Sequence, residues 1–361
     1  MQVVTRSESG GAQSVVSTLS SELSARGYEV AIASGPEGGG EAWRGLDASI
    51  ARFEVEGLVR DIAPLNEFRA LRALGRLYRN WRPDIVHLHT SKAGALGRLA
   101  GGIDGRRIVY TMHGFDQLRV SNRRFLAVDK ALRHRCGAVV AVSENDRTAM
   151  DAEGYDSLLV RNGCADSRPL RAGDAGIAGR LEALRKSGLP VVMMIARNAA
   201  PKRIDLAREA ARLMYGRASV AWLGGDPEPE DPPAFHALGS GTGTAAYLGY
   251  ADMFLLLSDH EGLSMSLIEA LSAGLPSVVS ATGGLLEVMG LDGAGESAIG
   301  LAVKNDADAV AGAIERLCAS PGERKRMGMA ARDLWSEKYS GTRMAEEYLG
   351  IYTRLSEMKA G

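Results

Sequence analysis

Cysteine is scarce in this chain, and the few that occur are widely separated. Among 361 residues there are three, Cys136, Cys164 and Cys318, and none belongs to a C-x-x-C pair. Disulfide-stabilised domains and zinc modules need cysteines in pairs or clusters. The sequence therefore argues against a disulfide framework and against a zinc site, and it favours reduced thiols in a cytoplasmic protein.

Long apolar runs are also missing. No stretch of about 18 consecutive apolar residues occurs, which is the length that crosses a bilayer as a helix. The residues after Met1 lack the apolar core of a secretory signal. We therefore expect a cytoplasmic protein, and we expect any contact with a membrane to be peripheral, at its inner face.

Charge of one sign does not dominate the chain as a whole. It has 43 basic and 44 acidic residues, so a protein built to bind nucleic acid is not expected. The balance is uneven locally, because the segment from Arg60 to Arg135 holds sixteen basic residues against six acidic ones. Two interpretations of this segment stay open: a solvated arginine-rich surface, or attraction to an anionic membrane face or a phosphorylated acceptor.

Short β-branched segments alternate with amphipathic helical patterns along the chain, without internal repeats or low-complexity blocks. This alternation is typical of parallel sheets with crossover helices, so the predicted fold class is α/β. The predicted strands are 2–5, 30–34, 85–89, 108–112, 138–142, 158–161, 191–196, 220–223, 253–257 and 277–280. The predicted helices are 12–26, 65–80, 203–214, 264–273 and 285–289, and further helices are expected from residue 306 onward.

The apolar periodicity disappears between residues 165 and 179, where Asp, Ser, Arg, Pro and Gly occur without an apolar pattern. This segment is predicted to be a linker. It separates a first Rossmann-like domain, residues 1–168, from a second, residues 176–338, and a C-terminal helix at about 340–361 is expected to pack back on the first. Two such domains facing each other would leave a cleft at the carboxyl ends of their strands, where ligands of doubly wound folds bind.

Two glutamates follow the predicted strand 253–257. Glu261 lies in the turn after this strand, and Glu269 lies within the next helix. At the start of that helix Ser264 and Ser266 are expected to act as caps, and its free N–H groups form a site for an anion or a hydroxyl. Two carboxylates at this spacing can bind two parts of one extended ligand. The alternative is a capping glutamate followed by a solvent-facing one.

A pair of cations follows the first strand of the second half. Arg197 closes the predicted strand 191–196, and Lys202 comes five residues later. Two fixed cations at the carboxyl end of a strand suit a diphosphate that leaves with a developing negative charge.

Glycines and histidines occupy the ends of predicted strands in the first half. Gly10 and Gly11 lie between the first strand and the first helix, where glycine allows the backbone to approach a phosphate or a sugar closely. A plain turn is the alternative, and the spacing is not that of a G-x-G-x-x-G dinucleotide motif. His89 and His113 each come at a strand end, whereas His87 lies inside a strand and is expected to be structural.

These motifs, in this order, resemble those of the retaining glycosyltransferase family 4, which has the GT-B fold of two Rossmann-like domains. The match runs from Gly10 to Glu287. The resemblance implies a donor site in the second half. There Glu261 would hold hydroxyls of the donor sugar together with the backbone of Gly262 and Leu263, Glu269 would hold the ribose, and Arg197 and Lys202 would hold the diphosphate.

In the first half the resemblance implies further roles. Gly10 and Gly11 would lie on the donor side, and His113 would orient the reacting sugar or stabilise the transition state. The acceptor side would include His89, Lys92, Ser143 and Asn162, with Lys92 near an acceptor phosphate, as in bacterial exopolysaccharide transferases of the family. The chain departs from the family pattern at Ala196 and Arg203, where glycines usually flank the two cations, so the approach of the backbone there is expected to differ.

The resemblance implies a retaining transferase that moves a sugar from a nucleotide diphosphate donor to an acceptor. A UDP-sugar is the first expectation and GDP-mannose the second; the acceptor is a glycan, a small molecule or a lipid-diphosphate-linked sugar at the inner membrane face. The implied front-face mechanism needs no cofactor and no metal, because Arg197, Lys202 and helix termini can neutralise the phosphate. Asp306 and Asp308 have the letters of a D-x-D metal motif but are expected to start a helix.

Other functions remain open from the sequence. They are a nucleotide-sugar epimerase or a phosphorylase of the same fold, a non-catalytic nucleotide-sugar-binding module and an NAD-dependent oxidoreductase. No nucleic-acid partner is expected, and the sequence does not specify an oligomeric state.

Overall fold

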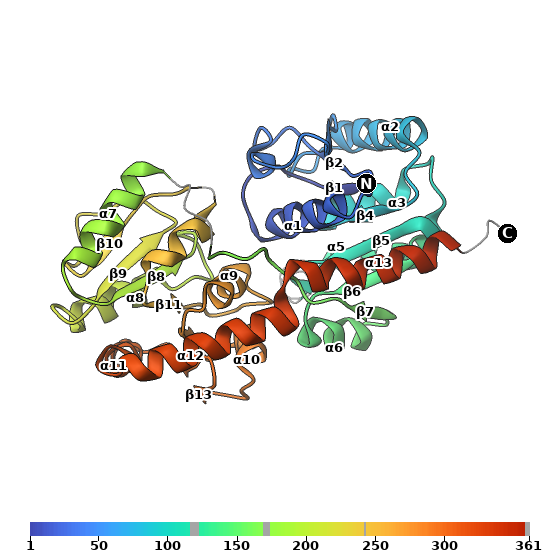
Figure 1. Cartoon of the computed structure of the whole chain (residues 1–361). Coiled ribbons are helices and arrows are strands. Elements are labelled where there is room, and N and C mark those ends of the chain that lie inside the picture. Colours follow the sequence, from blue (N-terminus) through green and yellow to red (C-terminus); the bar gives the residue numbers. More distant parts are fainter. Residues whose placement is uncertain (116–122, 169–173, 242, 358–361) are drawn as a thin grey trace. The chain divides into compact units, whose positions relative to one another are not determined.

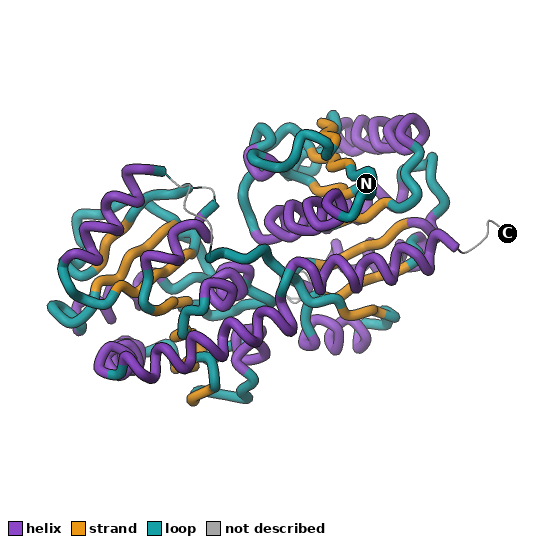
Figure 2. Tube along the Cα trace, viewed as in Figure 1, coloured by secondary structure: helices purple, strands orange, loops and turns teal. Residues whose placement is uncertain are grey.

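The computed structural model describes residues 1–115, 123–168, 174–241 and 243–357. It divides into two compact units, the first made of residues 1–163 and 341–361 and the second of residues 164–340. In each unit a layer of mostly parallel strands is enclosed by helices (Figures 1 and 2). The α/β fold class predicted from the alternating pattern is thereby confirmed.

The first unit is built on a seven-stranded sheet with the strand order β3-β2-β1-β4-β5-β6-β7. All of its strand pairs are parallel. The inner strands are buried on both faces, which explains why they read as continuous apolar runs in the sequence. The strands are β1 (Gln2–Val4), β2 (Ala31–Ser34), β3 (Ala51–Glu54), β4 (Val86–Leu88), β5 (Ile108–Met112), β6 (Ala138–Ala141) and β7 (Ser157–Leu159).

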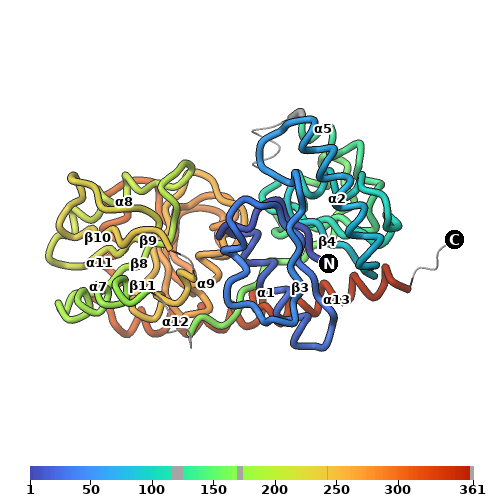
Figure 3. Tube along the Cα trace, turned by 90° about the horizontal axis from the view of Figure 1, so that it is seen from above, coloured from blue at the N-terminus to red at the C-terminus, as the bar shows by residue number. Residues whose placement is uncertain are grey.

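Helices cover both faces of this sheet. One face is covered by α2 (Pro64–Trp81), α3 (Ser91–Leu99) and α5 (Arg123–Leu132), and the other by α1 (Gly11–Ala25) and α13 (Gly341–Glu357) (Figures 1 and 3). The apolar side of α1 is buried at Val15, Val16, Leu19 and Leu23, as its 3.6-residue spacing predicts. The remaining helical segments are α6 (Glu144–Ala152) and the short turns η1 (Glu41–Trp43), η2 (Gly105–Arg107) and η3 (Arg133–Arg135).

The last helix belongs to the first unit although it follows the second in the chain. It packs against α1, and its residues Tyr348 and Ile351 are buried. The hydroxyl of Tyr348 lies 2.8 Å from Oγ1 of Thr111 in β5, and the hydroxyl of Tyr352 lies 2.6 Å from Nδ1 of His87 in β4. The C-terminal helix is therefore bonded directly to β4, the central strand, and to its neighbour β5.

The second unit has a seven-stranded sheet with the order β10-β9-β8-β11-β12-β14-β13. The pairing is parallel except between β13 and β14. The strands are β8 (Val191–Ile195), β9 (Ser219–Leu223), β10 (Phe235–Ala237), β11 (Met253–Leu256), β12 (Ser277–Ser280), β13 (Gly295–Ser297) and β14 (Gly300–Val303).

The helices of the second unit pack in pairs, α8 with α11 and α9 with α12. Asp306 caps α11 by accepting a 2.9 Å hydrogen bond from the backbone of Ala309, so the Asp306–Asp308 pair begins a helix as expected. None of the described helices is long and apolar enough to span a membrane. The helical segments are α7 (Ala175–Lys186), α8 (Ile204–Leu213), η4 (Thr244–Tyr250), α9 (Met265–Ala273), α10 (Gly283–Met289), α11 (Ala307–Ala319), α12 (Pro321–Leu334) and the π-helical turn η5 (Trp335–Tyr339).

The predicted linker 165–179 is wrong over its last part. Helix α7 begins at Ala175, and Asp174 caps it by accepting hydrogen bonds from the backbone of Gly176 and Ile177. The helix gives little periodic signal because Leu181 is its buried residue. At the other end Asp166 pairs with Arg332 of α12, so the division between units falls at residue 163 rather than at 168; residues 169–173 lie outside the described residues.

Four short strands were not predicted. They are β3, β10, β13 and β14, and the first three lie at the outer edges of the two sheets. Outer strands are short and partly exposed here, so their sequences lack a sustained apolar run: β3 is Ala-Arg-Phe-Glu and β13 is Gly-Glu-Ser.

Candidate active site

The predicted site residues lie in the loops that follow parallel strands. In the first unit Gly10 follows β1, His89 follows β4 and His113 follows β5; in the second, Arg197 follows β8 and Glu261 follows β11. The carboxyl ends of neighbouring parallel strands meet at one edge of a sheet, so each set is brought together within its own unit. We call these two groups the first-unit site and the second-unit site.

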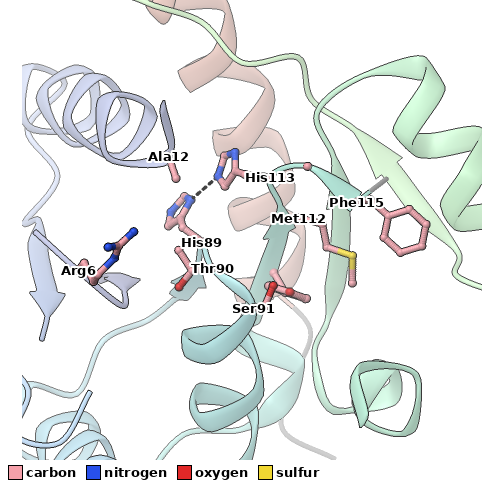
Figure 4. A pocket seen from close by; sticks show the side chains of 10 residues that line it. Arg6, Ala12, His89, Thr90, Ser91, Met112, His113 and Phe115 are labelled. Atoms are coloured by element: carbon pink, nitrogen blue, oxygen red, sulfur yellow. Dashed lines mark hydrogen bonds between the residues drawn. The ribbon is translucent and has the colours of Figure 1, made fainter. Parts of the chain in front are cut away.

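The first-unit site contains a cavity of about 350 Å³. Figure 4 shows it with the two predicted histidines side by side, Arg6 and Ala12 on one side of them and Phe115 on the other. Gly10 and Gly11 are exposed at the start of α1, directly before Ala12. The cavity is lined by Arg6, Ala12, His89, Thr90, Ser91, Tyr110, Met112, His113, Gly114 and Phe115.

The two predicted histidines are joined by a hydrogen bond. Nδ1 of His89 lies 3.2 Å from Nε2 of His113, and Nε2 of His89 lies 2.7 Å from Oε1 of Gln2 (Figure 4). Since an amide oxygen only accepts, Nε2 of His89 carries the hydrogen and its Nδ1 is the acceptor. His113 therefore donates from Nε2, and its other ring nitrogen, Nδ1, is left with a lone pair. That nitrogen has no hydrogen-bond partner among the described residues, so it can accept a hydrogen bond from a hydroxyl.

Burial keeps these histidines uncharged. Desolvation lowers the pKa of His113 to about 4, although the side chain is partly exposed to the cavity. Desolvation also lowers the pKa of His87 and of His89 well below the usual value, and the charges of neighbouring histidines add to the effect. His87, expected to be structural, bonds to Tyr352 and Thr111 on its two ring nitrogens and is buried.

A buried ion pair that the sequence did not reveal is connected to the cavity through Tyr110. Nη2 of Arg98 is 2.5 Å from Oδ2 of Asp129, and the hydroxyl of Tyr155 donates to the same carboxylate at 2.8 Å. The guanidinium of Arg98 also stacks on the ring of Tyr110, with its central carbon 4.4 Å from the ring centroid. Because Tyr110 lines the cavity, the cluster supports one of the rings that line it.

Lys92 is placed differently from its predicted role at an acceptor phosphate. Its ammonium donates to the carbonyl oxygens of Val59 at 2.7 Å and Asp61 at 2.5 Å, and it lies 2.5 Å from Oε1 of Glu67. These three acceptors use all the N–H groups of an ammonium. Lys92 therefore ties the loop before α2 to the first turn of α3, and it is not among the residues that line the cavity.

Ser143 and Asn162 are also predicted acceptor-side residues outside the cavity lining. Ser143 is buried and caps α6 by accepting a 3.0 Å hydrogen bond from the backbone of Asp146. Asn162 is 3% exposed, and its Oδ1 has no hydrogen-bond partner among the described residues. The geometry gives Ser143 a structural role and leaves the amide oxygen of Asn162 available.

In the second-unit site Lys202 and Glu261 form an ion pair. Both side chains are mostly buried, at 17% and 12% exposure, which reduces the screening of their charges by water. Arg197 lies in the same loop as Lys202, is exposed, and has no ion-pair partner among the described residues. The site thus combines a neutralised pair with one cation that is free to meet an anion.

Backbone pairing between two loops brings Lys202 to Glu261. Lys202 forms an isolated antiparallel bridge with Ser258, just after β11. The backbone of Asp259 donates to the carbonyl of Pro201 at 2.9 Å, and that of Arg203 donates to Leu257 at 3.0 Å. The loop after β8 is therefore fastened along the end of β11, and the side chains that follow each strand must meet.

Helix α9 begins beside this ion pair and carries the second predicted glutamate. Ser264 occupies the N-cap position but makes no side-chain cap, and its hydroxyl lies 3.2 Å from that of Ser266 instead. The predicted capping by these serines is therefore wrong, because they bond to each other. Glu269 is partly buried on α9, and Gly262 and Leu263 lie in the loop between Glu261 and the helix.

Two glycines that were not predicted as site residues support this loop. The backbone of Gly284 donates to the carbonyl of Glu261 at 2.8 Å. A β-carbon on Gly284 would stand 2.1 Å from the carbonyl oxygen of Gly262, and one on Gly283 would stand 2.7 Å from that of Glu261. The available signal is the Thr-Gly-Gly sequence that begins two residues after β12, since paired glycines after a strand permit close approach of two backbones.

A cluster of polar residues is hydrogen-bonded to the same loop. The backbone of Ser258 donates to Oγ of Ser280 at 2.9 Å, and the amide of Asn305 donates to the carbonyl of Ser258 at 3.1 Å and to the carboxylate of Asp259 at 3.0 Å. Arg203, which replaces a glycine of the family pattern, reaches the same carboxylate at 3.2 Å. Its side chain is thereby held against the loop that carries Glu261.

The chain matches two family profiles in agreement with this geometry. The profile described as Glycosyltransferase Family 4 matches residues 9–166, and the profile described as Glycosyl transferases group 1 matches residues 216–334. The chain belongs to glycosyltransferase family 4. It is a transferase with the GT-B fold that uses a nucleotide-sugar donor.

Curated relatives and solved structures lie at low sequence identity. This transferase is 27% identical over 261 residues to the UDP-Gal:α-D-GlcNAc-diphosphoundecaprenol α-1,3-galactosyltransferase of Escherichia coli. The aligned residues cover 65% of this chain and 67% of the relative. It is 25% identical over 324 residues to the α-maltose-1-phosphate synthase of Mycolicibacterium smegmatis, covering 75% and 79%. Similar solved structures include the sucrose-phosphate synthase of Thermosynechococcus elongatus, with a TM-score of 0.78 at 19% identity, and HepE of Anabaena in complex with UDP and glucose, with a TM-score of 0.78 at 16% identity; both comparisons cover 98% of each chain.

The uncharged histidines of the transferase predict a loss of stability in mild acid. A histidine with a lower pKa in the folded chain takes up a proton on unfolding, so the free energy of unfolding falls as the pH drops below about 6.5. For His113, with its folded-state pKa of about 4, the loss at about pH 5.5 is roughly 1.4 kcal/mol, and His87 and His89 add to it. Urea unfolding near pH 7.5 and pH 5.5 measures this difference. His113→Gln should reduce it and His134→Gln, at an exposed position, should not; an unchanged difference in the His113 variant would contradict the assignment.

Gly284→Ala should disturb the loop that carries Glu261. The added β-carbon would overlap the backbone of Gly262, and such overlap shifts the backbone at a cost of about 1–3 kcal/mol. We expect the affinity for UDP, measured by titration calorimetry, to fall at least about tenfold. Gly293→Ala is the matched control, because nothing lies within 4 Å of a β-carbon at that position. Equal affinities in the two variants would show that the close approach does not matter for the donor.

Proposed function

We propose that this transferase moves a sugar from a UDP-sugar, with retention of anomeric configuration and without a metal, to an acceptor carried on a lipid diphosphate. GDP-mannose is the second choice of donor. The observation that carries the proposal is the second-unit site, where Lys202 pairs with Glu261 before the start of α9 and the exposed Arg197 lies in the same loop as Lys202. The charges of this site, the uncharged ring of His113 and the named substrates of two relatives support it further.

The second-unit site has the charges that a nucleotide diphosphate sugar needs. Arg197 has no competing carboxylate among the described residues, and Lys202 keeps two N–H donors besides the one directed to Glu261. Together they can balance the negative charge of a diphosphate. Glu261 and the backbone at Gly262 and Leu263 are available to sugar hydroxyls, and Glu269 is proposed to bind the ribose. UDP is preferred because the E. coli relative is named for UDP-galactose and the HepE structure contains UDP.

The proposed transfer follows a front-face path. The bond between the anomeric carbon and the diphosphate oxygen breaks, and the electron pair leaves with the diphosphate. The acceptor oxygen bonds to the anomeric carbon on the same face, and its proton passes to the departing phosphate oxygen. Arg197 and Lys202 stabilise the charge that develops on the diphosphate, which is the role a metal ion has in other transferases.

His113 is proposed to position the sugar during this step. Its neutral ring presents the Nδ1 lone pair, because Nε2 donates to His89. A hydroxyl of the substrate can donate to that lone pair, and a neutral imidazole does not repel the positive charge that develops at the anomeric carbon. The low pKa caused by burial keeps this state populated throughout the physiological pH range.

The acceptor assignment rests on the E. coli relative and on charge. That relative is named for an acceptor linked to diphosphoundecaprenol. In the first-unit site Arg6 lines the cavity beside His89 and is partly exposed, so an anionic group can approach it. Arg6 also lies 2.6 Å from Glu8, which holds the guanidinium at the cavity rim. We propose peripheral association with the inner membrane face for the same reason.

Substitutions should separate donor binding from turnover. Glu269→Ala should raise the KM for the donor about 10-fold to 100-fold and change kcat little, since it removes a charged hydrogen bond present throughout the reaction. Glu261→Ala and His113→Ala should lower kcat about 10²-fold to 10³-fold, as expected for groups that act on the reacting sugar. Steady-state kinetics measure both effects. Glu182→Ala, at an exposed position of α7, serves as the control, and unchanged kinetics in all three site variants would refute the site.

Donor-dependent release of UDP tests the activity itself. Purified chain is given each nucleotide sugar in turn, with and without a GlcNAc-diphospholipid acceptor, and free nucleotide diphosphate is measured. We expect release that depends on the acceptor, an α-linked product from an α-linked donor, and equal rates with and without a chelator. Conversion of the donor without an acceptor would indicate an epimerase or hydrolase. A strict requirement for Mn²⁺ would refute the metal-free mechanism.

A further inference from the structure

Three large apolar side chains are exposed to solvent at the start of α2. Ile62 is 64% exposed, Leu65 is 59% exposed and Phe68 is 56% exposed. They fall within seven consecutive residues, whereas scattered single apolar residues are normal on protein surfaces. We call these three residues the α2 tip.

A line of arginines continues along the same helix. Residues Ala70, Leu74 and Tyr78 of α2 are fully buried, so the opposite side of the helix faces solvent. That side carries Arg69, Arg72, Arg76 and Arg79, which we call the basic stripe, and all four are exposed.

Few carboxylates neutralise the basic stripe. Arg69 has a loose contact of 3.7 Å with Glu56, and Arg72, Arg76 and Arg79 have no ion-pair partner in the described part of the chain. Arg72 also lies over the ring of Phe68, 5.6 Å from its centroid, which joins the stripe to the tip. The stripe therefore presents a net positive surface next to the apolar tip.

The only acidic residue within α2 does not cancel this charge. Glu67 is directed to the other side, where it lies 2.5 Å from Nζ of Lys92 and accepts a 2.9 Å hydrogen bond from the backbone of Ala63. These contacts also lower its pKa against the opposing effect of burial. The exposed side of α2 thus combines an apolar end with positive charge along its length.

The α2 tip lies at the same edge of the sheet as the first-unit cavity. The loop after β3 leads into α2, and the loops that line the cavity follow β1, β4 and β5 of the same parallel sheet. Lys92 holds the α2 tip in place relative to the cavity, because it donates hydrogen bonds to the carbonyls of Val59 and Asp61 just before the tip. Its chain neighbour Ser91 lines the cavity. A surface that binds the α2 tip would therefore lie near the opening of the first-unit cavity.

We propose that the α2 tip and the basic stripe dock on the anionic surface of a lipid bilayer. The three apolar side chains enter the boundary between headgroups and acyl chains, and the arginines contact lipid phosphates, as in other amphipathic helices that lie at membrane surfaces. Charge selects this occupant, because an apolar tip flanked by several unpaired arginines matches an anionic interface and not a neutral protein groove. The consequence for a lipid-linked acceptor rests on the proposed function, whereas the docking itself does not.

Vesicle binding of the full chain tests the docking. We expect the chain to sediment with phosphatidylcholine vesicles that contain about a third phosphatidylglycerol, at least tenfold more than with phosphatidylcholine alone, and to be released by about 0.5 M salt. The double variants Leu65→Ser with Phe68→Ser, and Arg72→Glu with Arg76→Glu, should each lose at least tenfold in binding.

Matched controls are Leu213→Ser with Tyr215→Ser, and Arg185→Glu with Lys186→Glu, at exposed positions of the second unit, which should bind like the unaltered chain. Equal binding by tip variants and controls, or none to anionic vesicles, overturns the proposal.

Two further measurements address the folding of the variants and a competing occupant of the surface. Equal melting temperatures of variants and controls show that the variants fold; if a pair loses its fold, the single variants Leu65→Ser and Arg72→Glu replace it. A concentration-dependent dimer that disappears in the tip variants would assign the surface to a second copy of the chain and overturn lipid docking.

Turnover measured on a vesicle-borne and on a soluble acceptor distinguishes failure of membrane docking from failure of the proposed function. UDP release is measured with an undecaprenyl-diphosphate-linked GlcNAc in anionic vesicles and with a short-chain, water-soluble analogue. We expect the tip variants to lose at least tenfold on the vesicle-borne acceptor and to keep their rate on the soluble one. Vesicle binding without turnover on either acceptor would refute the proposed acceptor and leave the docking intact. Full turnover of the vesicle-borne acceptor by tip variants would refute the docking role.

Discussion

The pairing between the loop after β8 and the end of β11 is the constraint on which the second-unit site depends. Neither Lys202 nor Glu261 belongs to regular secondary structure, yet their charges meet because the backbone of Lys202 bridges to Ser258. Parallel strands leave unpaired backbone groups at their carboxyl ends, and this bridge satisfies some of them while it fixes two loops at once. A cation and a carboxylate brought together in this way are organised before any ligand arrives. The diphosphate proposed to bind here would meet positions already set by the fold, so less order would have to be imposed when it binds.

The first-unit site differs from the second, since its central polar groups are histidines that stay uncharged. Three histidines lie close together near the carboxyl edge of the sheet, and burial lowers the pKa of each. Buried polar groups are tolerated where they have partners, and here Gln2 of the first strand and Tyr352 of the last helix supply partners to His89 and His87, whereas Nδ1 of His113 faces the cavity without one among the described residues. This gives a physical reason for α13 to belong to the first unit. Without it, His87 would lose the hydroxyl that satisfies its Nδ1, and β4, the strand that leads to His89, would lose that contact.

Much of this architecture follows from the sequence, and the failures have identifiable causes. The central strands and helices α1, α2 and α8 were predicted because burial on one or both faces imposes a regular apolar pattern. Edge strands such as β3 were missed because partial exposure permits Arg and Glu within them. The linker prediction failed at α7 because that helix buries little. In the site, the spacing of Glu261 and Glu269 pointed to one extended ligand, and that of Arg197 and Lys202 pointed to a diphosphate. The sequence could not show that Lys202 pairs with Glu261, that Gly284 packs on Gly262, or that Lys92 ties a loop, since each contact joins segments far apart in the chain.

The placement of Lys92 also changes how the basic first half is understood. From the sequence, its excess of arginine and lysine was one feature with two interpretations. The structure divides these residues by environment: Arg98 is buried against Asp129, Lys92 is used within the fold, and the arginines of α2 remain exposed and largely unpaired. A buried, paired cation stabilises the unit it belongs to, whereas an exposed cation can attract a charged partner. Of these residues, the exposed arginines of α2 are therefore the ones that can bind a partner. Since the exposed group adjoins Leu65 and Phe68, which no soluble anion would require, the combination favours an anionic surface with an apolar interior over a free phosphate.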